Sequence, residues 1–121
     1  MQHTGKKLLV VEDDPDILQF LQLVLEDEGY QVRTFTKGQD LEQLHKGELP
    51  DLILLDIFLS GRDGRELVKA LKDQEETKHI PVIMSSAHPR AEPTARAAGA
   101  DDFLAKPFNI DELLAMVEKY C

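Results

Sequence analysis

Five short apolar runs alternate along the chain with longer stretches in which apolar residues recur at helical spacing. Three of these runs are almost continuously apolar, which is typical of parallel strands that helices cover on both faces. Strands that alternate with helices in this way form right-handed βαβ units around a parallel sheet. The alternation therefore predicts an α/β fold, with strands at Leu8–Val11, Gln31–Phe35, Asp51–Leu55, Pro81–Ser85 and Asp102–Ala105.

The stretches between the runs carry helix signals of unequal strength. Asp14 and Pro15 favour the start of the first helix, and Gly29 favours its end. Asn109 and Glu112 form a capping-box pattern at the start of the last helix. The stretch between the fourth and fifth strands contains two prolines, so we expect a short fourth helix there. Apolar spacing marks the second helix at Leu41 and Leu44, and the third at Leu67, Val68 and Leu71.

Length and composition exclude several classes of protein. The 121 residues have the length of one compact domain, and we expect residues 1–121 to form a single domain whose residues 1–5 are disordered. The formal net charge of −9 argues against direct binding of nucleic acid by this domain. The chain has no membrane-length apolar run and no secretory signal, so we expect a cytoplasmic protein without membrane association. The only cysteine is Cys121, which excludes an intramolecular disulfide.

Polar side chains follow four of the five predicted strands. Glu12 and Asp13 follow the first strand, Asp56 the third, Ser86 the fourth and Lys106 the fifth. Because ligands of an open parallel sheet bind beyond the carboxyl ends of its strands, we expect these groups to converge at one edge. Carboxylates held close together repel each other, and a bound cation relieves that repulsion. Oxygen ligands without histidine or cysteine favour Mg²⁺, ahead of Ca²⁺ or Mn²⁺.

This set of groups indicates phosphoryl transfer. The reaction needs a nucleophile, together with positive charge that stabilises the equatorial oxygens of the transferred group. Asp56 is the candidate nucleophile, because it stands alone at its strand end ahead of small turn residues. Lys106 supplies a second positive charge beside the cation, and Ser86 can donate a hydrogen bond to an attached phosphoryl group.

Four segments of the chain resemble the receiver domains of bacterial response regulators. They are LLVVEDD, DLILLD with a DG pair that ends eight positions after Asp56, PVIMSSA and GADDFLAKPF, and the resemblance covers essentially the whole chain. The resemblance implies a flavodoxin-like three-layer α/β/α sandwich with strand order 2-1-3-4-5. It also implies a phosphorylation-dependent switch of a two-component phosphorelay. Such a domain catalyses its own Mg²⁺-dependent phosphorylation and its own dephosphorylation, and is not a turnover enzyme.

The resemblance assigns roles to the residues at the predicted edge. Asp56 is the expected phosphoacceptor, and the phosphoryl donor is a sensor histidine kinase or a histidine phosphotransfer protein. The phosphorylated domain is expected to act on a downstream effector. Asp13 and Asp56 are expected Mg²⁺ ligands, Glu12 acts through water, and the backbone carbonyl of Phe58 completes the protein ligands. Lys106 contacts the phosphoryl group, and its peptide bond to Pro107 is expected to be cis.

The resemblance also assigns residues to the switch, and the chain departs from the family pattern at some positions. Ser86 senses the phosphoryl group, and Phe103 turns inward in the switched state; a plain core role is the alternative for Phe103. The Phe58 side chain and His88 flank the acceptor, where the family tunes the lifetime of the phosphoryl bond. Glu12 stands where an aspartate is more usual.

Two other functions are compatible with the predicted fold. A phosphohydrolase that uses an aspartyl-phosphate intermediate needs an acidic residue two positions after its nucleophile, where this chain has Phe58. A receiver-fold interaction module that works without phosphorylation usually lacks the acidic pair, the acceptor or the lysine, all of which this chain has. The unusual fourth helix keeps this second alternative open.

Overall fold

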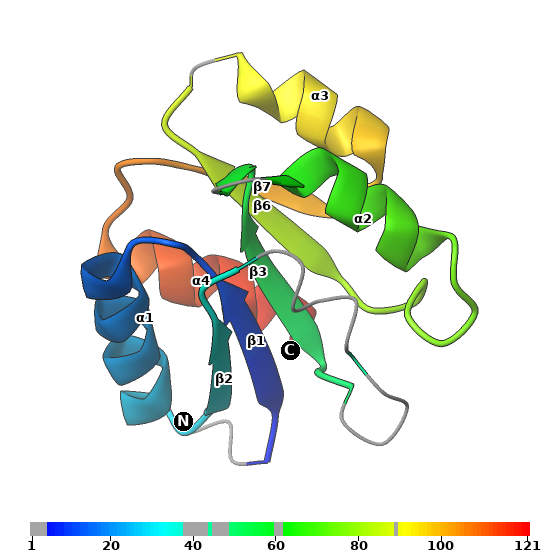
Figure 1. The fold of residues 1–121 in the computed structure, drawn as a ribbon. Coiled ribbons are helices and arrows are strands. Elements are labelled where there is room, and N and C mark those ends of the chain that lie inside the picture. Colours follow the sequence, from blue (N-terminus) through cyan, green and yellow to red (C-terminus); the bar gives the residue numbers. More distant parts are fainter. Residues whose placement is uncertain (1–4, 38–43, 45–48, 60–61, 89) are drawn as a thin grey trace.

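A five-stranded parallel sheet forms the middle layer of the molecule in a computed structural model, which describes residues 5–37, 44, 49–59, 62–88 and 90–121 (Figure 1). The sheet order is β2-β1-β3-β6-β7. Counted along the chain, these five strands have the predicted order 2-1-3-4-5. Their bounds lie within one residue of the predicted ones: β1 Lys7–Val11, β2 Gln31–Phe35, β3 Leu52–Asp56, β6 Val82–Ser86 and β7 Asp102–Ala105.

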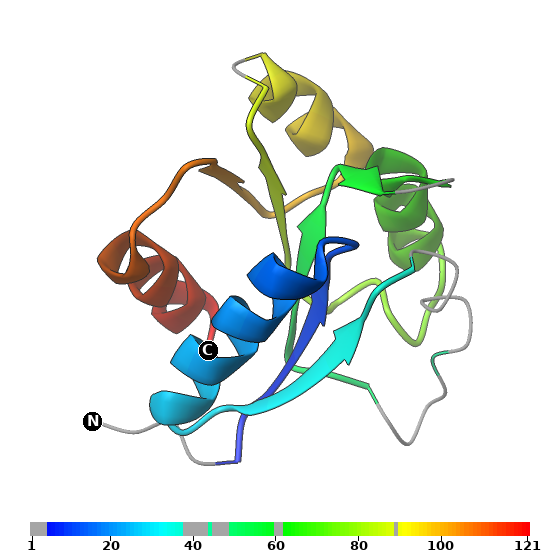
Figure 2. The ribbon, with the colours of Figure 1, turned by 60° about the vertical axis from the view of Figure 1, so that its left-hand side comes forward.

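Helices cover both faces of this sheet, which gives the predicted three-layer sandwich (Figures 1 and 2). Because successive side chains of a strand point to opposite faces, each apolar strand supplies both cores. Leu8 and Val10 of β1 pack on one face with α1 and α4, whereas Leu9 and Val11 pack on the other with α2 and α3. The helices span α1 Pro15–Asp27, α2 Gly64–Lys72, α3 Ala91–Ala98 and α4 Ile110–Tyr120.

Local signals set the helix ends where the sequence predicts them. The side chain of Asp14 accepts hydrogen bonds from the backbone N–H groups of Asp16 and Ile17 at the start of α1. The predicted capping box of Asn109 and Glu112 is present at the start of α4. The peptide bond between Lys106 and Pro107 is cis, as expected from the family resemblance.

The predicted short fourth helix is α3, which has eight residues. Pro93 lies in its first turn, where a missing backbone N–H removes no hydrogen bond of the helix. Gly99 ends α3 with a φ of 115°, a left-handed conformation that glycine adopts without a steric penalty. With Pro93 in its first turn and Gly99 at its end, this helix has about two turns, as the sequence predicts.

A small antiparallel hairpin after β3 was not predicted. It consists of β4 Phe58–Leu59 and β5 Arg62–Asp63, whose two-residue strands are too short to show an alternating pattern. The predicted second helix falls mostly on residues 38–48, of which the structure describes only residue 44. The expected disorder of residues 1–5 likewise concerns positions that, apart from Gly5, lie outside the described ranges. Across the ranges that are described, no helix combines the length and the apolar character needed to cross a membrane.

Candidate functional site

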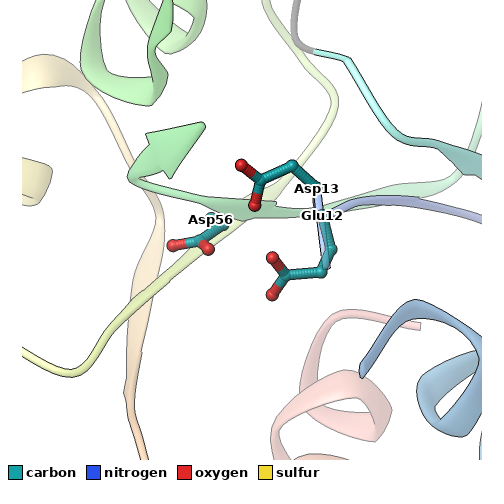
Figure 3. A group of neighbouring side chains, drawn as sticks. All are labelled: Glu12, Asp13 and Asp56. Atoms are coloured by element: carbon teal, nitrogen blue, oxygen red, sulfur yellow. The ribbon is translucent and has the colours of Figure 1, made fainter. Parts of the chain in front are cut away.

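The carboxyl edge of the sheet collects the acidic residues that follow β1 and end β3. Glu12 and Asp13 come directly after β1, and Asp56 is the last residue of β3, the neighbouring strand. One carboxylate oxygen from each residue lies within 4.8 Å of the others. Figure 3 shows the three carboxylates gathered around a common space. The structure thus brings together the acidic group that the sequence predicts.

Lys106 joins this group from the end of β7. Its Nζ lies 2.9 Å from Oε1 of Glu12 and 3.2 Å from Oδ2 of Asp56. The side chains are shielded from solvent, with exposed fractions of 21% for Lys106, 5% for Glu12 and 12% for Asp56. One part-buried ammonium group therefore bridges two of the three carboxylates.

The pKa values at this edge reflect an excess of buried negative charge. Burial raises the pKa of Glu12, and the nearby charge of Asp56 adds to the effect, while the hydrogen bond from Lys106 opposes it. Burial works to lower the pKa of Lys106, but its hydrogen bond to Glu12 and the charges of Asp56 and Glu12 outweigh burial and raise that pKa. Lys106 is therefore a firmly charged counter-ion at neutral pH.

Backbone geometry fixes the turn that presents Asp56. The N–H of Phe58 donates to Oδ1 of Asp56 at 3.3 Å, and the N–H of Gly64 donates to the carbonyl of Ile57 at 2.7 Å. A Cβ atom on Gly64 would lie 2.5 Å from the carbonyl oxygen of Asp56, so only glycine fits this approach without a shift. The sequence marks Gly64 as a small turn residue and as part of the DG motif, but not as a point of close backbone approach, because a contact across the turn leaves no periodic signal.

Ser86 is buried at the end of β6, beside this edge. Its Oγ accepts a hydrogen bond from the backbone N–H of His88 at 3.0 Å, and Nδ1 of His88 accepts one from the N–H of Arg90 at 3.2 Å. The neighbouring Ser85 has a different part, since its hydroxyl donates to the carbonyl of Leu104 and ties β6 to β7. Ser86 and His88 thus form a hydrogen-bonded turn at the site.

Two aromatic residues flank the edge in different environments. The side chain of Phe58 is 57% exposed, although its backbone belongs to the turn that holds Asp56. Phe103 is partly buried and packs against the core beneath α2 and α3. The roles predicted for Phe58 in lifetime and for Phe103 in switching stay predictions, because they concern other states of the molecule.

The residues at this edge fit a hard divalent cation. All three acidic groups offer carboxylate oxygen, and no histidine or cysteine belongs to the cluster within the described ranges. Lys106 pairs with Glu12 and Asp56, and a divalent ion would further offset the mutual repulsion of the three carboxylates. Mg²⁺ and Mn²⁺ both match this oxygen-only donor set.

The chain is similar to response regulators and their receiver domains in both sequence and structure. The sequence model described as the response regulator receiver domain matches residues 8–118. The phosphate regulon transcriptional regulatory protein PhoB of Rhizobium meliloti is 40% identical over 114 residues, which cover 93% of this chain and 50% of that protein. The chain thus spans about half the length of this curated relative.

Two solved structures share the fold. The receiver domain of sensor histidine kinase PA1611 from Pseudomonas aeruginosa, with a magnesium ion coordinated in its active-site cleft, has a TM-score of 0.88 and 28% identity, and the match covers 97% of this chain and 98% of that one. The chemotaxis protein CheY4 of Vibrio cholerae has a TM-score of 0.86 and 31% identity, with 96% and 98% covered.

Proposed function

Because the chain belongs to the response regulator receiver domain family, whose members serve two-component phosphorylation-dependent signalling, we propose that Asp56 accepts a phosphoryl group from a phosphohistidine. The observation that carries this proposal is the pairing of the Lys106 ammonium with Asp56 at 3.2 Å, inside a cluster of three carboxylates. Residues 1–121 act in this proposal as a single receiver domain.

The transfer step follows from the chemistry of these groups. A carboxylate oxygen of Asp56 attacks the phosphorus atom, a bond between phosphorus and oxygen forms, and the bond between phosphorus and the donor imidazole nitrogen breaks. The departing nitrogen takes a proton from solvent. Lys106 lies close enough to stabilise the negative charge on the transferred oxygens, and its raised pKa keeps it protonated throughout.

The acidic cluster is the proposed Mg²⁺ site, and Mn²⁺ fits the same donors. Asp13 and Asp56 would hold the ion directly, Glu12 through water, and the backbone carbonyl of Phe58 would complete the protein ligands. A bound divalent ion supplies the charge that neutralises the phosphoryl oxygens during transfer. Its presence in the similar structure of the PA1611 receiver domain supports this assignment.

Phosphorylation would switch the domain through Ser86 and Phe103. The new group adds about −1.5 to −2 charge and further acceptor oxygens. Ser86 already accepts a hydrogen bond from the backbone N–H of His88, and its hydroxyl would donate a hydrogen bond to an oxygen of the phosphoryl group. Movement of Ser86 opens space into which Phe103 turns, which shifts a two-state equilibrium of the output face. Phe58 and His88 flank Asp56 and set how readily water reaches the phosphoryl bond.

The domain is proposed to be a phosphoacceptor that removes its own phosphoryl group and not a turnover enzyme. A phosphohydrolase of related fold needs an acid two positions after the nucleophile, and Phe58 carries no proton to give. The proposed partners are a sensor histidine kinase or a histidine phosphotransfer protein and a downstream effector, in the cytoplasm. The net charge of −9 argues against direct contact of this domain with nucleic acid.

Intact-mass spectrometry after incubation with Mg²⁺ and acetyl phosphate tests the acceptor. We expect a single phosphoryl adduct that disappears in Asp56→Asn and in the presence of a chelator. Asp51→Asn is the matched control, because it removes a carboxylate next to the amino end of the same strand, where Oδ2 accepts a backbone hydrogen bond from Lys7. That variant should keep the adduct.

Two other outcomes would redirect the proposal. An adduct that persists in Asp56→Asn would move the acceptor to another residue. Absence of any adduct in a protein that binds Mg²⁺ by calorimetry would favour the phosphorylation-independent interaction module instead.

A further inference from the structure

Helices α2 and α3 lie side by side on the face of the sheet opposite α1 and α4 (Figures 1 and 2). The side chains of these two helices and of the turns beside them line a groove. It consists of two adjoining hollows of about 340 and 210 Å³ that share Arg65 and Thr94 as wall residues. The groove exists because α3 contributes mainly small side chains: Ala95 is fully buried beneath it, and Thr94 and Ala97 line it. Small residues bring the helix backbones close but leave the space above them unfilled.

The groove walls carry a local excess of positive charge. Arg65 is held by Asp63, with Nη2 of the guanidinium 2.7 Å from Oδ2 of the carboxylate, so this pair is internally neutral. Lys69 and Arg90 also line the groove, and neither forms an ion pair with a residue in the described ranges, although the charge of Lys69 helps to lower the pKa of Asp63. Glu66 is the one further carboxylate in the walls.

The rest of the helical surface is acidic. Helix α1 contains three acidic residues and no basic one, and α4 contains three acidic residues and one basic one. Helix α2 reverses this balance, with three basic residues and one acidic one. In a chain of net charge −9, an acidic ligand is therefore repelled by the α1 and α4 layer and attracted to the α2 and α3 layer.

One end of the groove also offers an apolar contact. Phe58, one of the four large apolar side chains that are exposed in the described structure, lines the smaller hollow together with Arg90 and His88. A ligand can pack an apolar side chain on the exposed ring and place a carboxylate against the neighbouring guanidinium group.

We propose that the groove between α2 and α3 docks an acidic segment of a partner protein, with an apolar anchor against Phe58 and carboxylates near Arg90 and Lys69. A short peptide fits better than a nucleic acid, because a peptide can place an apolar side chain on Phe58 and a few carboxylates near Arg90 and Lys69 at the same time. The surface is complete in the unphosphorylated protein, so the proposal does not depend on Asp56.

Titration of the isotope-labelled, unphosphorylated chain with a capped hexapeptide of four acidic residues, one phenylalanine and one leucine tests the docking surface. We expect saturable amide shifts that concentrate at Arg65, Lys69, Arg90 and Thr94. The double variant Lys69→Glu, Arg90→Glu should bind the peptide about fivefold more weakly, as the loss of two exposed ion pairs predicts. Raising the salt concentration should weaken the wild type more than this variant.

The matched control is the double variant Lys6→Glu, Lys37→Glu, which changes the net charge equally at exposed lysines that do not line the groove. It should bind within about twofold of the wild type. Equal weakening in both double variants, or no saturable shift at millimolar peptide, would overturn the proposal. A stronger response to a thymidylate hexamer than to the peptide would overturn the choice of partner. Arg90→Gln, which removes only one charge, guards against misfolding of the double variant.

Discussion

Glu12 and Asp102 are two equally buried carboxylates at opposite ends of the sheet, with exposed fractions of 4% and 6%. Glu12 shares a single lysine with Asp56 at the carboxyl edge. Asp102 begins β7 at the amino edge, where one carboxylate receives four donors: the guanidinium of Arg96, the N–H of Phe103, the ammonium of Lys119 and the hydroxyl of Tyr120. The carboxylate of Asp102 thus accepts from four donors, whereas that of Glu12 accepts from Lys106 and from the backbone N–H of Asp14.

The pKa values express this difference. Burial works to raise the pKa of Asp102, but hydrogen bonds from Phe103, Tyr120 and Lys119 outweigh it and hold that pKa below its ordinary value. Burial raises the pKa of Glu12 above its ordinary value, because the hydrogen bond from Lys106 does not fully offset burial and the nearby charge of Asp56. The hydrogen bonds to Asp102 at the amino edge therefore stabilise the fold. At the carboxyl edge the carboxylates repel each other, and a divalent cation would relieve that repulsion.

The largest expected effect is the difference in unfolding free energy between variants at the two ends of the sheet. Asp102→Ala should lower the free energy of unfolding by about 2–3 kcal/mol, since it removes a buried carboxylate that accepts from four donors. Asp56→Ala should change it by less than about 0.5 kcal/mol or raise it, because removing one of three crowded carboxylates relieves repulsion. Urea unfolding in chelator measures both. Asp27→Ala, at an exposed site on α1, is the control, and equal losses for Asp56→Ala and Asp102→Ala would contradict the comparison.

A divalent cation should act on one end only. At a free Mg²⁺ concentration ten times its dissociation constant, the wild type should gain about 1.4 kcal/mol of stability, as ligand linkage requires. Asp13→Asn should lose most of this gain, while Asp102→Asn should keep it on a less stable background. Thermal unfolding with and without Mg²⁺ gives the increments. A gain that Asp13→Asn retains in full would place the ion elsewhere.

The two ends should also respond to pH with opposite signs. The folded pKa of Asp102 lies below its ordinary 3.8, so its stabilisation is complete above that value and is lost as the pH falls through the folded pKa. The folded pKa of Glu12 lies above its ordinary 4.5, so protonation between those two values makes the folded state more stable as the pH falls.

Unfolding curves in chelator at a series of pH values check these signs through differences from the wild type. Glu12→Gln should remove the gain seen just above pH 4.5, and Asp102→Asn should remove the loss seen below pH 3.8. If Glu12→Gln instead made the low-pH gain larger, the folded pKa of Glu12 would not be raised.

The smallest expected effect concerns two side chains that donate to Asp102. Lys119 is 66% exposed and its Nζ is 3.3 Å from Oδ2 of Asp102, so Lys119→Ala should cost no more than about 0.5 kcal/mol. Tyr120→Phe should cost more, about 1 kcal/mol, because it removes the 2.8 Å hydrogen bond to the same carboxylate. Urea unfolding ranks the pair, and a reversed order would show that charge outweighs hydrogen bonding at this end.

Sequence reasoning located most of the carboxyl edge because its residues follow strands. Glu12, Asp13, Asp56, Ser86 and Lys106 each stand directly at or after the end of an apolar run, and parallel strands bring such positions together. The amino edge gave no comparable signal. The side chains that donate to Asp102 come from α3 and α4, and nothing in the spacing of Arg96, Lys119 and Tyr120 marks them as its partners.

The sequence by itself determined the order of elements, the helix caps and the residues at the strand ends, since these depend on local spacing and on the two-residue and 3.6-residue periods. Only the tertiary structure decided how the charges pair. Lys106 meets Glu12 and Asp56 across 94 and 50 residues of chain, and the groove beside α3 opens where small side chains meet a neighbouring helix. Such pairings depend on the packing distance between elements, which local sequence patterns do not encode.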